Sequence, residues 1–374
     1  QVMASLPAGS VSMCVTSPPY YGLRDYGIGE NPIGLEPTPE LFVAHMVEVF
    51  RGVWRVLRDD GTLWLNLGDS YAGSGKGPTG HNGIGDQEKR QGFSSAGSRM
   101  GSQHGDSGHT SGVRPPAGLK PKDLMLMPAR VALALQADGW YLRSDIIWHK
   151  PNPMPESVAD RPTTSHEHIF LLAKSQKYYY DADAIREANS PDGRQVTTVV
   201  GGNGSAQHRD GERWPNPNGR NKRSVWAVPT QPYPEAHFAT YPADLIRPCI
   251  LAGSPRESCA ECGAPLVREV EVEDRGFTDR TFRSVHQTAT AWNTNAHGKT
   301  TLAKDIVRTT NGFKASCDCN AGTTPGVVLD PFGGAGTTSL VARQEGRQSI
   351  YIELKQEYAE LAMQRIEKQP ERLL

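Results

Sequence analysis

The sequence lacks the features that mark secreted and membrane proteins. Its 374 residues include only 6 cysteines, which do not make a disulfide framework in a chain of this length. It contains neither a signal peptide nor an apolar run of membrane-spanning length. Neither sign of charge dominates, because 40 basic residues face 41 acidic ones. This balance argues against a protein that coats nucleic acid but allows local basic patches. We expect a soluble, cytoplasmic protein that does not bind membranes.

Apolar residues are also scarce. They make up 37% of the chain, whereas 39 glycines and 28 prolines indicate that much of its length is loop. The length suits one large α/β domain with insertions, or two domains. Because the chain begins with Gln1 and reaches a predicted strand at Val11, we expect further residues to precede it in the full-length protein.

The first part of the chain has the pattern of a β-α-β unit. Residues 11–16 (VSMCVT) predict a buried strand that ends at two adjacent prolines. A helix is predicted from Thr38 until residues 59–61 (DDG) stop it, and residues 62–68 (TLWLNLG) predict a second strand. The apolar residues of the helix are spaced to share one face: Leu41, Val43, Met46, Val47, Phe50, Val53, Trp54 and Leu57.

Two polar, locally basic stretches interrupt this pattern. Residues 74–122 contain seven Lys or Arg and three Asp or Glu, and they predict either a disordered surface loop or a loop that orders on a partner. A helix over 124–140 and strands over 141–150 and 166–174 are predicted next. The second stretch, 189–232, ends in a basic cluster beside a tryptophan: Arg220, Lys222, Arg223 and Trp226. The cluster suits either a nucleic-acid surface or an exposed turn beside a core side chain.

The clearest unit lies near the carboxyl terminus. It consists of a strand, a glycine-rich turn, a helix and a second strand, at residues 327–330, 331–336, 337–346 and 349–353. The glycines let a ligand approach the backbone, and the start of the helix offers free N–H groups. Glu353 ends the second strand 23 residues after Asp330, where a carboxylate can accept hydrogen bonds from ribose hydroxyls. The unit indicates an adenosine-type cofactor bound to a doubly wound sheet.

The unit departs from nucleotide-binding motifs that hold phosphate. The third glycine of a dinucleotide fingerprint would fall at Ser339, and no Gly-Lys-Ser/Thr follows the turn, which excludes a P-loop. Asp330 at the strand end suits a cationic ligand better than a pyrophosphate. S-adenosylmethionine, which carries a sulfonium and an ammonium and no phosphate, satisfies these conditions.

The cysteines form two close pairs. Cys259 and Cys262 have the spacing of a metal knuckle, and Cys317 and Cys319 follow after 54 intervening residues. Four thiolates make a closed structural zinc site, although the pairs could also be loop thiols that never meet. No His-x-Glu precedes the first pair, which disfavours a catalytic zinc deaminase. The other cysteines, Cys14 and Cys249, are predicted to be buried small hydrophobes.

Two motifs resemble those of a known family. Residues 16–20 (TSPPY) and 330–338 (DPFGGAGTT) resemble the catalytic motif and the cofactor loop of the β-class DNA amino-methyltransferases. The resemblance covers nearly the whole chain, and it also includes 148–155 (WHKPNPMP), 164–174 (TSHEHIFLLAK) and 237–242 (HFATYP). It implies a Rossmann-like methyltransferase fold with a mostly parallel, doubly wound sheet. The motif order is permuted, because the catalytic motif precedes the cofactor loop.

The resemblance also implies the cofactor contacts. Residues 237–242 are similar to the segment that closes over the methionine end of S-adenosylmethionine, and Glu353 matches the acidic residue that binds the ribose. The family's Gly-Asp pair before the catalytic strand is absent, so one cofactor contact has no counterpart. The expected cofactor-binding residues are Thr16, His237, Phe238, Ala239, Thr240, Asp330, Pro331, Phe332, Gly333, Gly334, Gly336, Thr337 and Glu353.

The catalytic motif suggests how an amine could be methylated. An exocyclic base amine is a poor nucleophile, because its lone pair is delocalised into the ring. Two acceptors aimed at its hydrogens, Ser17 Oγ and the Pro18 carbonyl, would pull the nitrogen towards tetrahedral geometry. Pro19 would hold the corner rigid, and Tyr20 would stack on a base flipped out of the duplex. Tyr21 and the residues after it are expected to line the DNA or cofactor mouth.

The same motif indicates direct transfer without a covalent intermediate. Methylation at carbon 5 of cytosine would need a nucleophilic cysteine, whereas the TSPPY corner contains no cysteine and Cys14 lies within the predicted strand before it. After transfer the amine must lose a proton, either to solvent or to a nearby acceptor such as Asp25. In the family, serine before the two prolines is associated with N4 of cytosine, and Asp or Asn with adenine.

Alternatives to cytosine methylation remain. An adenine-N6 methyltransferase on the same scaffold is one, and an enzyme acting on RNA is another. A nucleic-acid-binding protein with a vestigial cofactor site is a third, although Ser17, Asp330 and Glu353 are all intact. A Rossmann oxidoreductase is disfavoured by Ser339 and gives TSPPY no role.

The expected organisation has five parts. A catalytic half includes a mobile basic loop at about 73–122, and candidate DNA-recognition, cofactor-closing, zinc-binding and cofactor-binding segments follow it. Their bounds are 1–188, 189–232, 233–256, 257–323 and 324–374. The expected partner is double-stranded DNA, as in restriction–modification systems, and a homodimer is possible.

Overall fold

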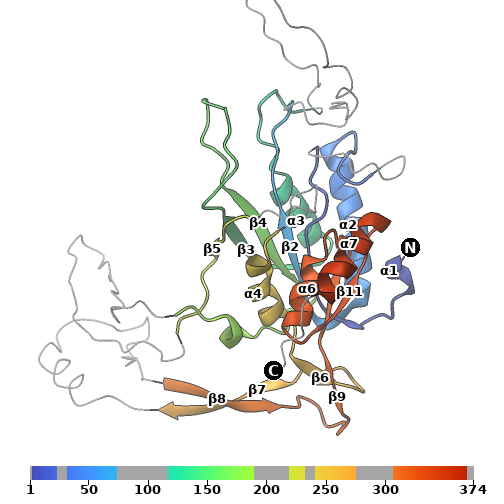
Figure 1. The fold of residues 1–374 in the computed structure, drawn as a ribbon, viewed down its shortest axis with the longest axis vertical. Helices are drawn as coiled ribbons and strands as arrows, with labels where there is room; N and C mark the ends of the chain where they lie inside the picture. The colour runs from blue at the N-terminus through green and yellow to red at the C-terminus, as the bar shows by residue number, and fades with distance from the viewer. Residues whose placement is uncertain are drawn as a thin grey trace, which may run out of the picture.

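A seven-stranded sheet forms the centre of the fold. Figure 1 shows it in a computed structural model, which describes residues 2–22, 32–73, 116, 118–188, 219–231, 241–274 and 306–368. The order is β11-β10-β1-β2-β4-β3-β5. Only β4 runs antiparallel to its neighbours, so the mostly parallel sheet predicted from the sequence is confirmed. The strands are β1 (Val11–Thr16), β2 (Leu57–Leu67), β3 (Tyr141–His149), β4 (His166–Ala173), β5 (Val225–Ala227), β10 (Val327–Asp330) and β11 (Gln348–Tyr351).

Helices cover both faces of this sheet (Figure 1). The helices are α1 (Val2–Ser5), α2 (Pro39–Val56), α3 (Met127–Ala137), η1 (Ala182–Ile185), α4 (Ala243–Gly253), α6 (Thr337–Gln344) and α7 (Gln356–Glu367). Buried residues of α2 and α3 pack on one face, those of α4 and α6 pack on the other, and α7 lies against α6. None of the helices in the described ranges is long and apolar enough to cross a membrane. The sheet is therefore the middle of three layers.

Helix α2 begins and packs as its sequence dictates. The Thr38 hydroxyl caps it by accepting a hydrogen bond from the Leu41 N–H at 3.2 Å, and Pro39 occupies the first turn, where no N–H donor is needed. Its buried side chains recur at helical spacing and face the sheet: Phe42, Met46, Phe50, Val53 and Val56.

Two details of α2 differ from the predicted helix. Leu41 is 39% exposed, because Phe42 takes the inward position one residue later. The helix also ends at Val56, and Leu57 already begins β2 by pairing with the start of β1. Residues 59–61 therefore lie inside a strand, where pairing within the sheet overrides the local turn signal.

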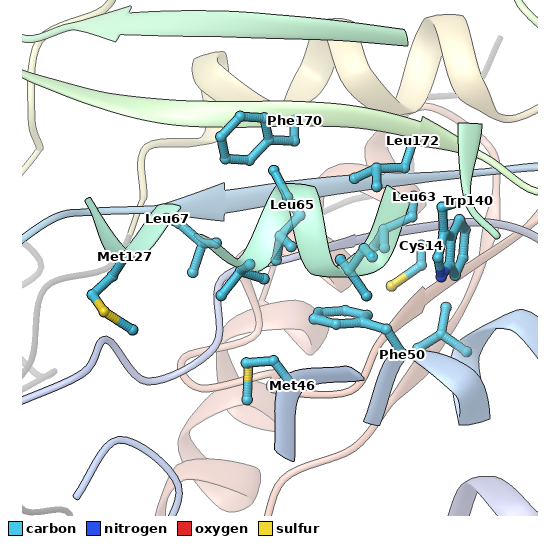
Figure 2. Packing of buried hydrophobic residues seen from close by; sticks show 14 of the residues in the cluster. Cys14, Met46, Phe50, Leu63, Leu65, Leu67, Met127, Trp140, Phe170 and Leu172 are labelled. Atoms are coloured by element: carbon cyan, nitrogen blue, oxygen red, sulfur yellow. The ribbon is translucent and has the colours of Figure 1, made fainter. Parts of the chain in front are cut away.

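The strands divide their side chains between two cores. Figure 2 shows the core between the sheet and α2–α3, where Leu63, Leu65 and Leu67 of β2 point towards the helices. All six residues of β1 are buried, as predicted, and from Met13 to Val15 they alternate between the two cores. Cys14 belongs to this first core, whereas Met13 belongs to the second core beneath α4 and α6. The prediction that Cys14 and Cys249 are buried is confirmed.

The segment predicted as a polar loop contributes an edge strand instead. β5 pairs parallel to β3, with Trp226 opposite Trp148, and the Trp226 side chain is buried in the second core. Arg220 and Arg223 each lie 3.0 Å from the Glu187 carboxylate. Lys222 lies 4.9 Å above the Trp226 ring. The basic cluster is thus a turn beside a core side chain, which is the second of the two interpretations given from the sequence.

Two small antiparallel sheets lie outside the central sheet. One pairs β6 (Glu257–Cys259) with β9 (Thr323–Pro325), and the other pairs β7 (Val267–Asp274) with β8 (Ile306–Lys314). Because β9 leads directly into the start of β10, these sheets lie at the amino-terminal edge of the central sheet (Figure 1). They are placed away from the edge at which the predicted catalytic motif lies.

Candidate active site

The predicted catalytic motif and cofactor loop leave the sheet side by side. β1 and β10 are parallel neighbours, so their carboxyl ends, Thr16 and Asp330, meet at one edge. The Thr16 hydroxyl donates a hydrogen bond to Asp330 Oδ1 at 2.6 Å, across 314 residues of sequence. Doubly wound sheets bind their ligands in the crevice outside this edge. The two segments therefore form one site.

Asp330 is the most enclosed ionisable group of the site. It is 1% exposed, and it accepts hydrogen bonds from the Thr16 and Thr338 hydroxyls, both at 2.6 Å. The Tyr241 hydroxyl at 3.0 Å and the Phe332 N–H at 3.1 Å also donate to it. Burial raises the pKa of Asp330, and the four hydrogen bonds oppose that rise. Because these donors favour the ionised form, the carboxylate suits a cationic ligand.

Tyr241 was missed by sequence reasoning. Its hydroxyl contacts both Asp330 and the Thr338 hydroxyl, and burial, followed by the charge of Asp330, raises its pKa well above the ordinary value. It therefore stays protonated as a donor. The only signal was its place in the HFATYP segment. The four predicted contacts just before it, residues 237–240, lie outside the described residues.

The glycines make room at the start of α6. Gly336 caps this helix with φ +74°, and a Cβ added there would lie 2.7 Å from the Ala362 Cβ. A Cβ added at Gly333 would lie 2.2 Å from the Tyr351 ring. Over Gly334 the space is open, because an added Cβ would meet only the Phe332 carbonyl, at 4.0 Å. The loop is a cradle that only glycine permits.

Glu353 faces this cradle from the neighbouring strand. It lies two residues beyond the end of β11, one strand outside β10, and not at the strand end predicted from the sequence. Its Oε2 accepts from the Gly334 N–H at 2.9 Å, and its Oε1 accepts from the Lys355 N–H at 2.9 Å. Pro331 and Phe332 lead into the loop, and Thr337 begins α6. Two carboxylates thus flank an open, glycine-lined space.

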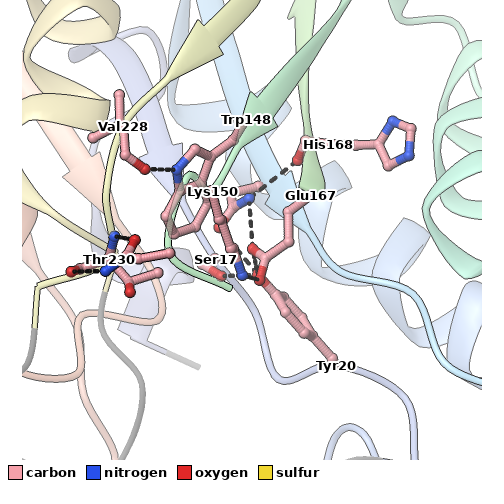
Figure 3. Close-up of polar contacts among 10 residues, drawn as sticks. Ser17, Tyr20, Trp148, Lys150, Glu167, His168, Val228 and Thr230 are labelled. Atoms are coloured by element: carbon pink, nitrogen blue, oxygen red, sulfur yellow. Dashed lines mark hydrogen bonds and ion pairs between the residues drawn. The ribbon is translucent and has the colours of Figure 1, made fainter. Parts of the chain in front are cut away.

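The catalytic corner, shown in Figure 3, follows Thr16, which is hydrogen-bonded to Asp330. Ser17 follows Thr16 directly, and its hydroxyl donates to the Tyr20 hydroxyl oxygen at 3.2 Å. Pro18 is buried, whereas Pro19 is half-buried. The Tyr20 hydroxyl lies 2.7 Å from Glu167 Oε2 and 3.0 Å from Asn66 Oδ1. The predicted catalytic residues are therefore tied to β2 and β4.

Comparison with known proteins identifies the family. The family model described as DNA methylase, which covers N6 and N4 amino-methyltransferases, matches residues 11–259 and 320–364. The chain belongs to this family. The predicted resemblance to β-class DNA amino-methyltransferases is confirmed, and the protein is a DNA methyltransferase that uses S-adenosylmethionine.

Curated relatives align over nearly the whole methyltransferase chain. Type II methyltransferase M.Cfr9I of Citrobacter freundii is 39% identical over 98% of this chain and 84% of its own length. Type II methyltransferase M.SmaI of Serratia marcescens is 37% identical over 94% of this chain and 82% of its own. The solved PvuII DNA methyltransferase (cytosine-N4-specific) is similar with a TM-score of 0.49 at 15% identity, covering 100% of this chain and 84% of that one.

Three further side chains of the methyltransferase site had no role predicted from the sequence. Glu167 is the second residue of β4, and Lys150, just after β3, forms an ion pair with it. Lys150 also lies 4.5 Å above the ring of Trp148. Asn66 of β2 donates to Glu167 Oε2 at 3.2 Å. Both Lys150 and Glu167 lie in family-like segments, but Glu167 reaches the corner only because β4 runs in the reverse direction and begins at this edge.

Tyr21 does not line the mouth of the methyltransferase site, contrary to the prediction. It is 4% exposed, and its ring lies 5.6 Å from that of Phe42 on α2. Burial raises the pKa of Tyr21 to about 12, with smaller contributions from Glu36 and Glu40. Tyr21 therefore anchors the corner on the first core. Asp25, the candidate proton acceptor, lies outside the described residues.

The four predicted metal-binding cysteines of the methyltransferase come together. The Sγ atoms of Cys259, Cys262, Cys317 and Cys319 all lie within 4.8 Å of one another. The Gly263 N–H donates to the Cys259 carbonyl at 2.9 Å, which closes the first pair into a knuckle. The two pairs therefore do meet, although the 54 residues between them separate them in sequence.

We expect Gly68 to be required for the position of Tyr20. A Cβ added at Gly68 would lie 2.6 Å from the Tyr20 ring, which is held at its hydroxyl and cannot move freely. Gly68→Ala should therefore displace the ring and slow methyl transfer by about 10-fold in single-turnover assays. Gly312→Ala is the matched control, because an added Cβ there meets nothing within 4 Å. Equal rates for the two variants would contradict this role.

Proposed function

We propose that this protein methylates N4 of cytosine in double-stranded DNA, as a Type II methyltransferase like its curated relatives. The hydrogen bond of 2.6 Å between Thr16 and Asp330 carries the proposal. It fixes the acceptors at Ser17 and Pro18 next to the carboxylate that suits a cationic methyl donor. A nucleic-acid-binding protein with a vestigial cofactor site would have no reason to keep a buried carboxylate with four donors.

The residues of the cradle fit S-adenosylmethionine. Asp330, with Thr16 and Tyr241 around it, would hold the positively charged methionine end. The open space over Gly334 would accept the adenosine, and Glu353 would accept hydrogen bonds from the ribose hydroxyls. The rest of the cofactor loop would line this site: Pro331, Phe332, Gly333, Gly336 and Thr337. We assign to residues 237–240 the predicted role of closing over the methionine end of the cofactor. When bound, S-adenosylmethionine supplies an electrophilic methyl group on a sulfonium.

The corner prepares the amine to accept that methyl group. The target base must leave the duplex stack, which costs a few kcal/mol. Ser17 Oγ and the Pro18 carbonyl accept the two amine hydrogens, so that the nitrogen lone pair is no longer delocalised into the ring. Pro19 restricts the backbone between them. Tyr20, whose ring is fixed by its hydroxyl contacts, offers a surface for the flipped base.

Cytosine is favoured over adenine by the serine of the corner. Serine presents one short neutral acceptor, and the family associates it with N4 of cytosine. An adenine-N6 methyltransferase on the same scaffold is the second candidate, because the geometry of the corner would also admit that amine.

Methylation of unmodified genomic DNA by the purified protein, followed by base-resolved sequencing, tests the proposal. N4-methylcytosine at one recurring sequence is the expected product. If the product is N6-methyladenine instead, the protein is an adenine-N6 methyltransferase, the second candidate. The absence of any modified base, with S-adenosylmethionine bound and DNA intact, would refute methyl transfer to DNA.

The four cysteine thiols are proposed to hold a structural zinc ion. Their mutual distances suit a tetrahedral four-thiolate site, and four protein ligands leave no open position for catalysis. The zinc would join β6 to the segment before β9 and so fix the 257–323 insertion at the amino-terminal edge of the sheet. Its role is therefore in folding and not in methyl transfer.

Purification without chelator should yield one zinc ion per chain. Replacing Cys259 and Cys262 together by serine should abolish zinc binding and lower the melting temperature, because the metal stabilises the insertion. Elemental analysis and thermal melting measure both effects. Cys249→Ala is the matched control, since Cys249 is buried in the second core. A zinc-free protein with an unchanged melting temperature would refute the site.

A further inference from the structure

A chain of hydrogen bonds leads from the catalytic serine to a carboxylate (Figure 3). The Ser17 hydroxyl donates to the Tyr20 oxygen at 3.2 Å, and the Tyr20 hydroxyl lies 2.7 Å from Glu167 Oε2. The Glu167 and Lys150 side chains are only 15% and 19% exposed. Lys150 pairs with Oε1 of Glu167 and leaves Oε2 to Tyr20 and Asn66. The carboxylate is thus held by groups from three strand ends.

The direction of these hydrogen bonds follows from the number of protons available. Tyr20 has one hydroxyl proton, which can go to Glu167 Oε2 at 2.7 Å or to Asn66 Oδ1 at 3.0 Å. The shorter contact, to an ionised acceptor, is the stronger one. The Asn66 amide group donates to Glu167 Oε2 at 3.2 Å and to the His168 carbonyl at 3.1 Å, which keeps its orientation fixed. The Tyr20 proton therefore goes to Glu167.

This direction decides what Ser17 can do. A serine hydroxyl can donate one hydrogen bond and accept two. Because the Tyr20 proton is used by Glu167, the Tyr20 oxygen can accept the Ser17 proton. The lone pairs of Ser17 then remain for an amine that brings its own hydrogens. Without Glu167, Tyr20 could donate to Ser17 and reverse the polarity of the corner.

We propose that Glu167 is a positioning residue that acts through Tyr20 to hold Ser17 as an acceptor and receives the proton released after methyl transfer. The inference rests on the proposed function, because it requires an amine at Ser17. It assigns an acceptor from the described residues to the proton that the methylated nitrogen must lose.

The proton transfer balances without any other reactant. Once the N–C bond has formed, the nitrogen carries a positive charge and one N–H bond too many. That N–H bond breaks and its proton goes to Ser17 Oγ, while the Ser17 proton moves to Tyr20 and the Tyr20 proton to Glu167 Oε2. A new O–H bond on Glu167 replaces the broken N–H bond, and no electrons are exchanged with any other group. Glu167 later returns the proton to solvent.

Three variants test the relay in single-turnover assays at saturating S-adenosylmethionine and DNA. Glu167→Gln keeps the shape of the side chain but cannot take a proton, and Tyr20→Phe keeps the ring but breaks the chain. Each should slow transfer by about 100-fold, with an unchanged Kd for S-adenosylmethionine. Because both act on one relay, the double variant should be no slower than either single variant. Glu48→Gln, on the exposed side of α2, is the matched control.

Chemical rescue separates proton acceptance from a structural role. Glu167→Ala leaves room for a small carboxylate, so formate should restore part of its transfer rate, whereas chloride at the same ionic strength should not. A slow Glu167→Ala variant that formate does not rescue would overturn the proton transfer to Glu167. Wild-type rates in Tyr20→Phe or Glu167→Gln, beside an inactive Ser17→Ala, would overturn the whole inference and leave the proposed function intact. An active Ser17→Ala would instead refute the proposed function.

Discussion

Ser17→Ala should abolish detectable methyl transfer while leaving S-adenosylmethionine binding nearly unchanged. Ser17 Oγ is the side-chain acceptor that the proposed mechanism gives to the amine, and losing one placed hydrogen-bonding group at a reacting centre typically costs 100- to 1000-fold in rate. The cofactor carboxylate Asp330 bonds to Thr16 and not to Ser17, so its environment stays as it is. Single-turnover transfer and calorimetric cofactor titration measure the two effects separately.

Ser5→Ala is the matched control for this variant. Ser5 lies in α1, where its hydroxyl only donates to the Val2 carbonyl at 2.8 Å. Its loss should leave both transfer and binding at wild-type values. Full activity in Ser17→Ala would rule out the acceptor mechanism, whereas loss of cofactor binding would show that the corner and the cradle cannot be separated.

Asp330→Asn should abolish S-adenosylmethionine binding without unfolding the protein. The amide has nearly the same shape as the carboxyl group but carries no charge to balance a sulfonium or an ammonium. If the amide nitrogen takes the place of Oδ2, the Thr338 hydroxyl can rotate to accept from it, while the Thr16 hydroxyl and the Phe332 N–H still donate to the remaining oxygen. We expect the cofactor Kd to rise by at least about 100-fold, because hydrogen bonds to charged groups contribute up to about 3 kcal/mol each.

The stability of the same variant should depend on pH in a defined direction. Burial raises the pKa of Asp330 in the folded state above its ordinary value of 3.8, so the folded protein holds this proton more tightly than the unfolded chain. The stability contributed by Asp330 is therefore full below that value and declines as pH rises through the folded pKa. The Asp330→Asn variant has no carboxyl group at this position, so it does not lose stability in this way as pH rises. Its melting temperature relative to wild type should increase between acidic and neutral pH, and a decrease would contradict the sign.

The strongly patterned parts of the fold were predictable from the sequence. The apolar run of β1, the amphipathic spacing of α2 and the strand–turn–helix around Gly334 each carry their signal within a short window. The meeting of Thr16 with Asp330 was also within reach, because parallel neighbouring strands end at one edge.

The support behind the corner was not predictable in the same way. Glu167 reaches Tyr20 only because β4 runs antiparallel between β2 and β3, and no local pattern encodes the direction of a buried strand. β5 was missed for a related reason, since three residues with a single inward tryptophan are too few to show alternation. Tyr241 gained its role from a hydrogen bond to a strand 89 residues away.

The central position of β1 sets how the corner opens. Ser17 continues the most enclosed strand of the sheet, with β10 on one side and β2 on the other. Fluctuations that expose a frayed edge strand cost little, but releasing β1 requires both neighbours to separate and both cores to open. Releasing the strand that carries the catalytic serine is therefore coupled to unfolding of the sheet, so the base of the corner shares the global stability of the domain.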